Sequence, residues 1–203
     1  MSTRAPAHRR DFGWRASTVT GVLRLRPPVA QISEAEGVLI ERCSDGARRL
    51  VQIGVAEGGS AWHARRTMDH DGTLHLIDTY PRVAGLNLSS IIAKRLVDSV
   101  PRGHVEWIRA RSDEAVRGWS LPIDFLFIDG DHAYDAVRRD WADWVPHVAP
   151  RGRVGLHDAL LDAEWMDASY GSARFVGELL EPGSGWRLAE RADSLAVVER
   201  ERA

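Results

Sequence analysis

The stretch IDFLFIDGDHAY, residues 123–134, decides the fold that we expect for this chain. Its first seven residues form a short, mostly apolar run that ends in Asp129, which is typical of a strand buried in a sheet. Residues 132–148 then carry apolar side chains at helical spacing. A buried strand followed directly by a helix indicates a parallel sheet with helices on its faces.

The same alternation extends on both sides of this stretch. Strands are predicted at residues 49–54, 73–78, 104–110, 123–129 and 151–158, with helices at 33–43, 60–68, 86–99, 132–148 and 172–180 and a short one after residue 110. Five alternations predict an α/β protein with a mostly parallel, doubly wound sheet. Residues 185–190 and 194–200 leave no room for a helix between them, so we expect an antiparallel hairpin at one edge, joined by residues 191–193.

Composition excludes several classes of protein. The 203 residues fit one domain, and 44% hydrophobic with 28% charged residues is a globular balance. A net charge of −2 gives no overall basic field for nucleic acid. No stretch approaches the roughly 20 apolar residues of a membrane span, and no signal peptide is visible. Cys43 is the only cysteine and cannot form an internal disulfide, so we expect a reducing, cytoplasmic location.

Residues 1–30 differ from the rest of the chain. They contain six arginines and a single acidic residue, Asp11. One interpretation is an arm over the surface of the domain; the other is a segment that covers a ligand site or a second copy of the chain. We therefore expect an Arg-rich arm at residues 1–30, one domain at residues 31–203, and a homo-oligomer formed through the arm.

The ends of the first two strands favour a nucleoside. GVAEGGS, residues 54–60, is a glycine turn, but Ala56 breaks the dinucleotide pattern G-x-G-x-x-G, and the only lysine, Lys94, lies too far away for a phosphate loop. Glu57 would repel a pyrophosphate and favour a cationic ligand. Asp78 ends the second strand and can accept hydrogen bonds from both hydroxyls of a ribose, although a turn aspartate is the alternative.

The later strand ends carry further polar side chains. Ser112 either caps the next helix or contacts an adenine. Residues 129–132 hold two carboxylates and an imidazole, which are costly to bury unless a metal or ligand compensates them. Asp129, His157 and Asp158 are placed to converge on one cation, either magnesium, calcium or manganese or a transition metal. The alternative is that His157 and Asp158 only stabilise their own loop.

Three segments resemble a known family: VQIGVAEGGSAWHAR (51–65), LHLIDTY (74–80) and FLFIDGDHAYDAVRRDWADWVPHVAPRGRVGLHD (125–158). They are similar to class I S-adenosylmethionine-dependent methyltransferases, in the group with an F-I-D-G-D-H-x-Y segment and a later H-D pair. That group is related to catechol-type and macrolide-sugar O-methyltransferases. The resemblance covers about residues 31–199 and implies a Rossmann-like, doubly wound, seven-stranded sheet, mostly parallel with an antiparallel C-terminal hairpin.

The resemblance also implies roles for the strand-end residues. The cofactor S-adenosylmethionine would contact Gly54, Glu57, Gly58, Gly59, Ser60, Asp78, Ser112, Asp129 and His132. Asp78 would hold the ribose, Ser112 would lie by the adenine, and Asp129 would face the methionine end. In metal-dependent relatives the residues matching Asp129 and Asp158 bind magnesium, and His157 stands where some have aspartate.

The expected reaction is O-methylation of a small hydroxylated molecule. The protein has to align acceptor, methyl group and sulfur, and a hydroxyl acceptor has to lose its proton. Two routes are open. A divalent cation such as Mg²⁺ at Asp129, His157 and Asp158 would lower the pKa of the bound hydroxyl. Without a metal, His132 or His157 would be the general base, with Asp129 and Asp158 orienting the acceptor.

Other functions are also open. A nucleotide-dependent oxidoreductase or sugar-modifying enzyme uses a similar sheet, but Ala56 and Glu57 argue against it. A non-catalytic S-adenosylmethionine-binding protein is disfavoured by the chemistry of residues 129–132. A nucleic-acid methyltransferase is disfavoured because the basic residues concentrate in the arm. We expect residues 160–170 and the arm to form the walls around the acceptor.

Overall fold

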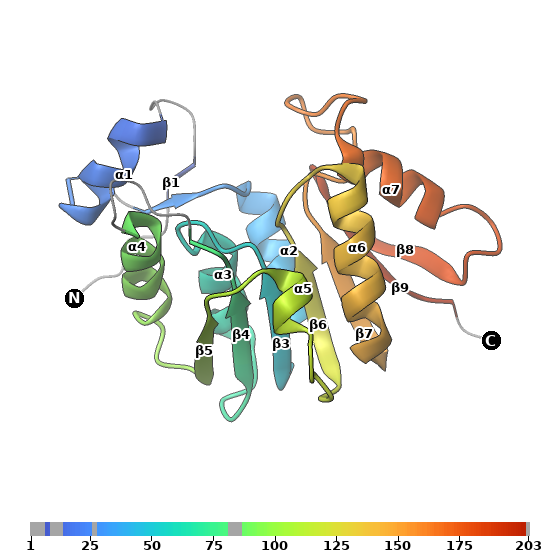
Figure 1. Ribbon diagram of the computed structural model, residues 1–203, viewed down its shortest axis with the longest axis horizontal. Coiled ribbons are helices and arrows are strands. Elements are labelled where there is room, and N and C mark those ends of the chain that lie inside the picture. The colour runs from blue at the N-terminus through green and yellow to red at the C-terminus, as the bar shows by residue number, and fades with distance from the viewer. Residues whose placement is uncertain (1–6, 9–13, 26–27, 81–86, 202–203) are drawn as a thin grey trace.

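A seven-stranded sheet forms the centre of the molecule (Figure 1). The computed structural model describes residues 7–8, 14–25, 28–80 and 87–201. The strands are β3 (Arg49–Ile53), β4 (Thr73–Ile77), β5 (His104–Ile108), β6 (Ile123–Ile128), β7 (Val148–Leu156), β8 (Trp186–Ala192) and β9 (Leu195–Arg200). Their order is β5-β4-β3-β6-β7-β9-β8. The strands from β5 to β7 run parallel, and β9 is antiparallel to both β7 and β8, which confirms the predicted sheet.

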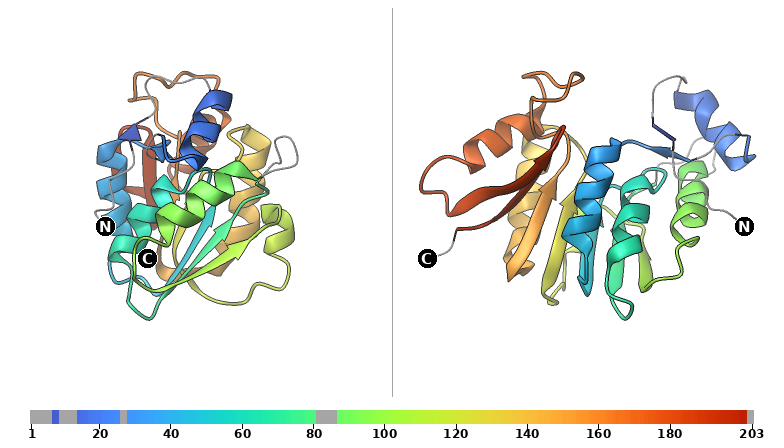
Figure 2. Two further views of the ribbon diagram at one scale, coloured as in Figure 1. Left: turned by 90° about the vertical axis from the view of Figure 1, so that its left-hand side faces the viewer. Right: turned by 180° about the vertical axis from the view of Figure 1, so that it is seen from behind.

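Helices cover both faces of the sheet, as the doubly wound pattern predicts. One face carries α2 (Glu34–Ser44), α3 (Gly59–Thr67) and α4 (Leu88–Val97); the other carries α5 (Ser112–Ala115), α6 (Tyr134–Trp144) and α7 (Gly171–Leu179) (Figures 1 and 2). A 3-10 turn, Val145–His147, follows α6. Successive side chains of a strand alternate between the two cores: Leu50 joins the first and Val51 the second. None of the helices in the described ranges is long and apolar enough to cross a membrane.

Strand β3 is the point at which the strand order reverses. It pairs with β4 on one side and with β6 on the other, so the loops after these strands diverge to opposite faces. In open α/β sheets a ligand binds at this place, beyond the carboxyl ends of the strands. The fold therefore places the residues directly after β3, β4, β5 and β6 around one crevice.

The C-terminal hairpin is tighter than predicted. The prediction that residues 191–193 form the link is wrong, because Arg191 and Ala192 pair with Ala196 and Leu195 as part of the ladder. The turn consists of Asp193 and Ser194, with Asp193 at a positive φ of 43°. Ser194 is fully buried, whereas Asp193 is exposed.

The described part of the predicted arm contains β1 (Ala7–His8), α1 (Trp14–Val22) and β2 (Val29–Ala30). The strands β1 and β2 pair in parallel, and α1 lies beside α4 (Figure 1). The guanidinium of Arg95 on α4 donates a hydrogen bond of 2.8 Å to the carbonyl oxygen of Val22. The rest of the predicted arm, residues 1–6, 9–13 and 26–27, lies outside the described residues.

Candidate active site

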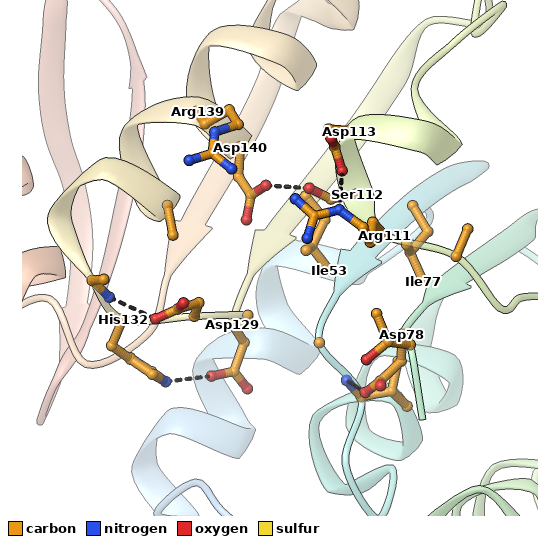
Figure 3. A pocket seen from close by; sticks show the side chains of 18 of the residues that line it. Ile53, Ile77, Asp78, Arg111, Ser112, Asp113, Asp129, His132, Arg139 and Asp140 are labelled. Atoms are coloured by element: carbon orange, nitrogen blue, oxygen red, sulfur yellow. Dashed lines mark hydrogen bonds and ion pairs between the residues drawn. The ribbon is translucent and has the colours of Figure 1, made fainter. Parts of the chain in front are cut away.

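A cavity of about 620 Å³ lies at the carboxyl ends of β3, β4, β5 and β6. Its volume is in the range of small-molecule sites, roughly 300–1,000 Å³. The predicted site residues that line it are Gly54, Asp78, Ser112, Asp129 and His132 (Figure 3). These residues follow four different strands, so the sheet brings together four segments that lie far apart in the sequence.

Gly54 lets the loop after β3 lie directly against the segment after β6. Its φ is +81°, a conformation that other residues rarely adopt. A Cβ atom at this position would collide with the carbonyl oxygen of Asp129. Only glycine therefore permits this close approach of the two strand ends, which forms the floor of the cavity.

Asp78 anchors the glycine turn. Its Oδ2 accepts hydrogen bonds from the backbone N–H groups of Val55 (2.9 Å) and Ala56 (3.2 Å), and its Oδ1 accepts one from the N–H of Tyr80 (2.6 Å). A carboxylate has about four acceptor sites, so one is left for a ligand. To accept hydrogen bonds from both ribose hydroxyls, as expected from the sequence, Asp78 would have to lose one of its hydrogen bonds to the backbone.

The other predicted residues of the glycine turn lie outside the cavity lining. Gly58 is the N-cap residue of α3 at φ +86°, and Gly59 faces Ala30 so closely that a Cβ would clash. Ser60 is buried and its hydroxyl accepts a hydrogen bond of 2.7 Å from Gln52. The side chain of Glu57 is buried and accepts a 2.9 Å bond from the N–H of Val29. These four residues support the turn and join it to the end of the arm.

Ser112 lines the cavity and donates a hydrogen bond to Asp140 (Figure 3). The N-cap residue of α5 is Arg111, so the alternative that Ser112 caps this helix is wrong. Burial raises the pKa of the Asp140 carboxyl, despite the bond from Ser112. Asp140 also lines the cavity and was not predicted from the sequence. The signal was its position four residues after Ala136 and four before Trp144, an acid on the apolar face of a helix.

His132 lies on the cavity wall between two carboxylates. Its Nε2 is 3.9 Å from Oδ1 of Asp129, and its Nδ1 is 3.6 Å from Oδ2 of Asp158. The side chain is 36% exposed, which leaves the imidazole accessible from the cavity. The ring of Tyr170 stands edge-on at 6.3 Å between ring centres.

His157 lies behind Asp129, outside the cavity lining. Its Nδ1 donates a hydrogen bond of 2.8 Å to Oδ1 of Asp129, and its Nε2 is 3.4 Å from Oε2 of Glu36. The side chain is only 4% exposed. Burial by itself lowers the pKa of this imidazole, but the carboxylates of Asp129, Glu36 and Asp158 outweigh it and raise the pKa well above 6.5. The three carboxylates therefore favour the protonated form of this imidazole, against the effect of burial.

Glu36, which forms the capping box of α2 with Ser33, completes this cluster. Its carboxylate is fully buried and accepts hydrogen bonds from the N–H of Ser33 (2.7 Å) and from the N–H (3.0 Å) and hydroxyl (2.7 Å) of Ser194. Burial raises the pKa of Glu36, yet the charge of His157 and these hydrogen bonds prevail and lower it. We call Glu36, His157 and Asp129 the buried triad.

The residues predicted as metal ligands do not fit a divalent cation. Asp129, His157 and Asp158 are brought together, but they pair with one another. In the part of the chain that the structure describes, no group of three or more His, Cys, Asp or Glu side chains is arranged to hold a metal ion. We therefore derive no catalytic step from a metal.

Comparison with known families identifies the class of protein. Residues 51–159 match a family model described as a methyltransferase domain. This match covers more than half of the chain. The chain belongs to this methyltransferase family. The methyltransferase match runs from β3 to the residue after Asp158, so it includes all the residues predicted for the cofactor and the metal but not Glu36.

Solved structures share the fold of this methyltransferase. The O-methyltransferase TomG from Streptomyces achromogenes, involved in tomaymycin synthesis and solved in complex with SAM, is 19% identical, with 94% of this chain and 91% of that chain covered and a TM-score of 0.67. A Bacillus cereus O-methyltransferase in complex with SAH is 18% identical, with 91% of each chain covered and a TM-score of 0.62. A Corynebacterium glutamicum protein is 19% identical, with 93% of this chain and 89% of that chain covered and a TM-score of 0.67. At these identities the similarity establishes the fold.

Proposed function

We propose that this methyltransferase transfers the methyl group of S-adenosylmethionine to a hydroxyl group of a small molecule. The observation that carries the proposal is the cavity at the strand-order reversal, with Asp78 after β4, Asp129 after β6 and His132 on one wall. Two proteins of the same fold, TomG and the Bacillus cereus enzyme, are O-methyltransferases solved with SAM and with SAH. Both ligands carry the adenosine that such a cavity suits.

The residues of the cavity fit the cofactor. Gly54 leaves room for a ligand at the crossing of two strand ends, and Asp78 has one acceptor site for a ribose hydroxyl. Ser112 and Asp140 would lie at the adenine end, and Asp129 at the methionine end. When bound, S-adenosylmethionine supplies a methyl group on a positively charged sulfur. The carboxylates at Asp78 and Asp129 favour a cationic ligand over a pyrophosphate, which also argues against a nicotinamide dinucleotide.

We assign the general base to His132. It is exposed to the cavity, and Asp129 and Asp158 on either side would stabilise the imidazolium formed when it accepts the hydroxyl proton. His157, the other candidate, is buried, lies outside the cavity lining and directs its Nδ1–H at Asp129. It is therefore not suited to act as a base. A positioned base contributes about 10²–10⁴-fold to the rate.

The acceptor is proposed to enter on the side of His132. Tyr170, at the end of the predicted acceptor wall of residues 160–170, has its ring beside His132. In the same segment, the indole N–H of Trp165 donates a 3.2 Å bond to Oδ1 of Asp158, and about half of this side chain is exposed. Aromatic rings at this place suit a flat, hydroxylated acceptor. The net charge of −2 favours a small molecule over nucleic acid.

The domain division belongs to the same proposal. Residues 31–203 would form the catalytic domain, and residues 1–30 an arm that contacts a second copy of the chain. The contact of α1 with α4 and the bond from Val29 to Glu57 support an arm that lies on the domain beside the glycine turn. A cytoplasmic location is proposed because the single cysteine, Cys43, is buried as a free thiol.

Calorimetric titration tests the proposal. S-adenosylmethionine and S-adenosylhomocysteine are titrated into metal-stripped protein, with and without added magnesium. We expect both to bind, and magnesium to change neither affinity. The product S-adenosylhomocysteine is then measured during incubation with a panel of catechols, phenols and sugars. Absence of binding by either ligand would overturn the proposal, and binding of NAD in their place would support the oxidoreductase.

A further inference from the structure

The buried triad connects the cavity to a distant part of the fold. Glu36 lies in the first turn of α2, and its partner Ser194 lies in the β8–β9 turn, 158 residues later. The start of α2 and this turn lie side by side at the upper edge of the sheet (Figure 2, right). From Ser194 the contacts run through Glu36 and His157 to Asp129 on the cavity wall. A ligand in the cavity thus touches one end of a continuous line of buried polar contacts.

Stability does not explain these buried charges. Glu36 is 0% exposed and the side chain of His157 is 4% exposed. Charges taken out of water are costly, and well-packed apolar residues in place of a buried ion pair are often as stable or more so. Glu36 also caps α2, but a glutamine at this position completes a capping box equally well. The charge of Glu36 therefore needs another reason.

The geometry at Asp129 supplies that reason. The side chain of Asp129 is only 16% exposed, and the Nδ1–H of His157 holds its Oδ1 at 2.8 Å. This bond fixes the plane of the carboxylate and leaves Oδ2 for a ligand. Behind it, Nε2 of His157 faces Oε2 of Glu36 at the ion-pair distance of 3.4 Å, and Glu36 accepts three hydrogen bonds from Ser33 and Ser194. The carboxylate at the cavity wall is thus oriented from behind.

We propose that Glu36 and His157 are positioning residues that act through Asp129, holding its carboxylate in the orientation that binds the methionine end of the cofactor. This inference rests on the proposed function. Neither residue lines the cavity, so neither touches the cofactor. Glu36 also lies outside the residues that match the family model.

The same helix provides a matched control. Glu41 on α2 forms a second Glu–His pair, with 2.8 Å between its Oε1 and Nδ1 of His63 on α3. This pair is partly exposed, at 22% and 14%, and neither residue lines the cavity. Glu41→Gln therefore removes a carboxylate from a Glu–His pair on α2 without touching the buried triad.

A double-mutant cycle tests whether Glu36 acts through Asp129. The affinity for S-adenosylhomocysteine is measured by calorimetry in the full-length protein, in Glu36→Gln, in Asp129→Asn and in the double variant. We expect each single variant to bind about five- to tenfold more weakly, and the double variant no more weakly than Asp129→Asn alone. Glu41→Gln is expected to bind like the unmodified protein.

A purely structural role predicts a different result. Glu36→Gln would then weaken binding by the same factor in both backgrounds, and this outcome would overturn the proposal, as would an unchanged affinity in Glu36→Gln. If the unmodified protein binds neither S-adenosylhomocysteine nor S-adenosylmethionine, the proposed function fails and the inference fails with it. If the unmodified protein binds these ligands but the effects of Glu36→Gln and Asp129→Asn on the affinity are additive, only the positioning role is overturned.

If Glu36→Gln does not fold, a second pair of variants, at His157, tests the proposal. His157→Gln keeps a side-chain N–H donor for Asp129, whereas His157→Leu removes the donor and the charge. We expect His157→Gln to retain most of the affinity that His157→Leu loses. Equal affinities in these two variants, with equal circular dichroism spectra, would contradict positioning through the hydrogen bond.

Discussion

The Nδ1 atom of His157 lies 2.8 Å from Oδ1 of Asp129, with the imidazole almost completely buried and the carboxylate at the cavity wall. One residue thus faces the ligand site and the other faces the core. His157 lies on the strand end next to that of Asp129, because β6 and β7 are paired in parallel. Sheet register alone therefore brings this histidine behind the carboxylate.

The stability of the protein should depend on pH through His157. Its pKa in the folded protein is raised well above 6.5 by the facing groups Asp129, Glu36 and Asp158, with His132 nearby on the same side. Its contribution to stability is complete below pH 6.5, the unfolded value, and is lost as the pH rises through the folded value. Over that interval the free energy of unfolding should fall by about 1.4 kcal/mol per pH unit from this group.

Urea unfolding at a series of pH values checks this prediction. Because other groups also titrate, the quantity compared is the difference between the unmodified protein and His157→Gln. The variant should lose less stability than the unmodified protein between pH 6.5 and the alkaline range. If the free energy of unfolding changes with pH in the same way in both proteins, His157 binds no more protons in the folded state than in the unfolded state.

Gly54→Ala should destabilise the protein more than an ordinary glycine substitution. The new methyl group meets the carbonyl oxygen of Asp129, and φ is +81°. Gly118→Ala is the matched control, since its φ is +82° and nothing lies within 4 Å of the added Cβ. Gly118→Ala should lower the free energy of unfolding by about 1 kcal/mol, through backbone strain alone. Gly54→Ala should lower it by at least about 1 kcal/mol more, as measured by denaturant unfolding. Equal losses would mean that the loop moves aside freely.

The sequence predicts the strand ends of the cavity well. Apolar runs of strand length end at Gly54, Asp78 and Asp129, and parallel strands place their carboxyl ends at one edge of the sheet. All three residues line the cavity. This part of the site follows from local patterns and from one rule of topology.

The buried triad could not be predicted in this way. The capping box with Ser33 is a sufficient local reason for Glu36, while its partner Ser194 is 158 residues away. The charge of His157 depends on carboxylates from three separate segments. The expectation of a metal at His157 failed for the same reason, because a sequence gives the ligand types but not which of them already neutralise one another. Pairing also extended β8 through Arg191, which looked like part of a turn.

Asp78→Asn should weaken cofactor binding. The carboxylate oxygens hold the N–H groups of Val55, Ala56 and Tyr80. An amide keeps only one oxygen acceptor, so at least one of these bonds is lost and the glycine turn loosens. Charge-assisted bonds of this kind contribute about 1.5–3 kcal/mol, so the affinity for S-adenosylmethionine should fall by about tenfold or more. Calorimetry measures the change.

Asp124→Asn provides the control for this substitution. Asp124 also accepts two backbone N–H bonds, from Arg48 and Arg49, but it lies at the start of β6 and away from the cavity. Asp124→Asn should lower the stability of the protein without changing the affinity of the folded protein for S-adenosylmethionine. An unchanged affinity in Asp78→Asn would argue against the proposed ribose contact and against the role of this turn in binding.

His132→Gln should remove the general base while leaving the cofactor site intact. The imidazole faces the cavity between Asp129 and Asp158, and glutamine cannot accept a proton at neutral pH. With an acceptor found in the panel of hydroxylated compounds, kcat should fall by about 10²–10⁴-fold, while the affinity for S-adenosylhomocysteine changes little. As a control, His70→Gln should leave kcat unchanged, because His70 is exposed and lies outside the cavity lining. Full turnover in His132→Gln would show that the acceptor loses its proton to another group or directly to water, and would leave alignment of the acceptor as the main contribution of the protein.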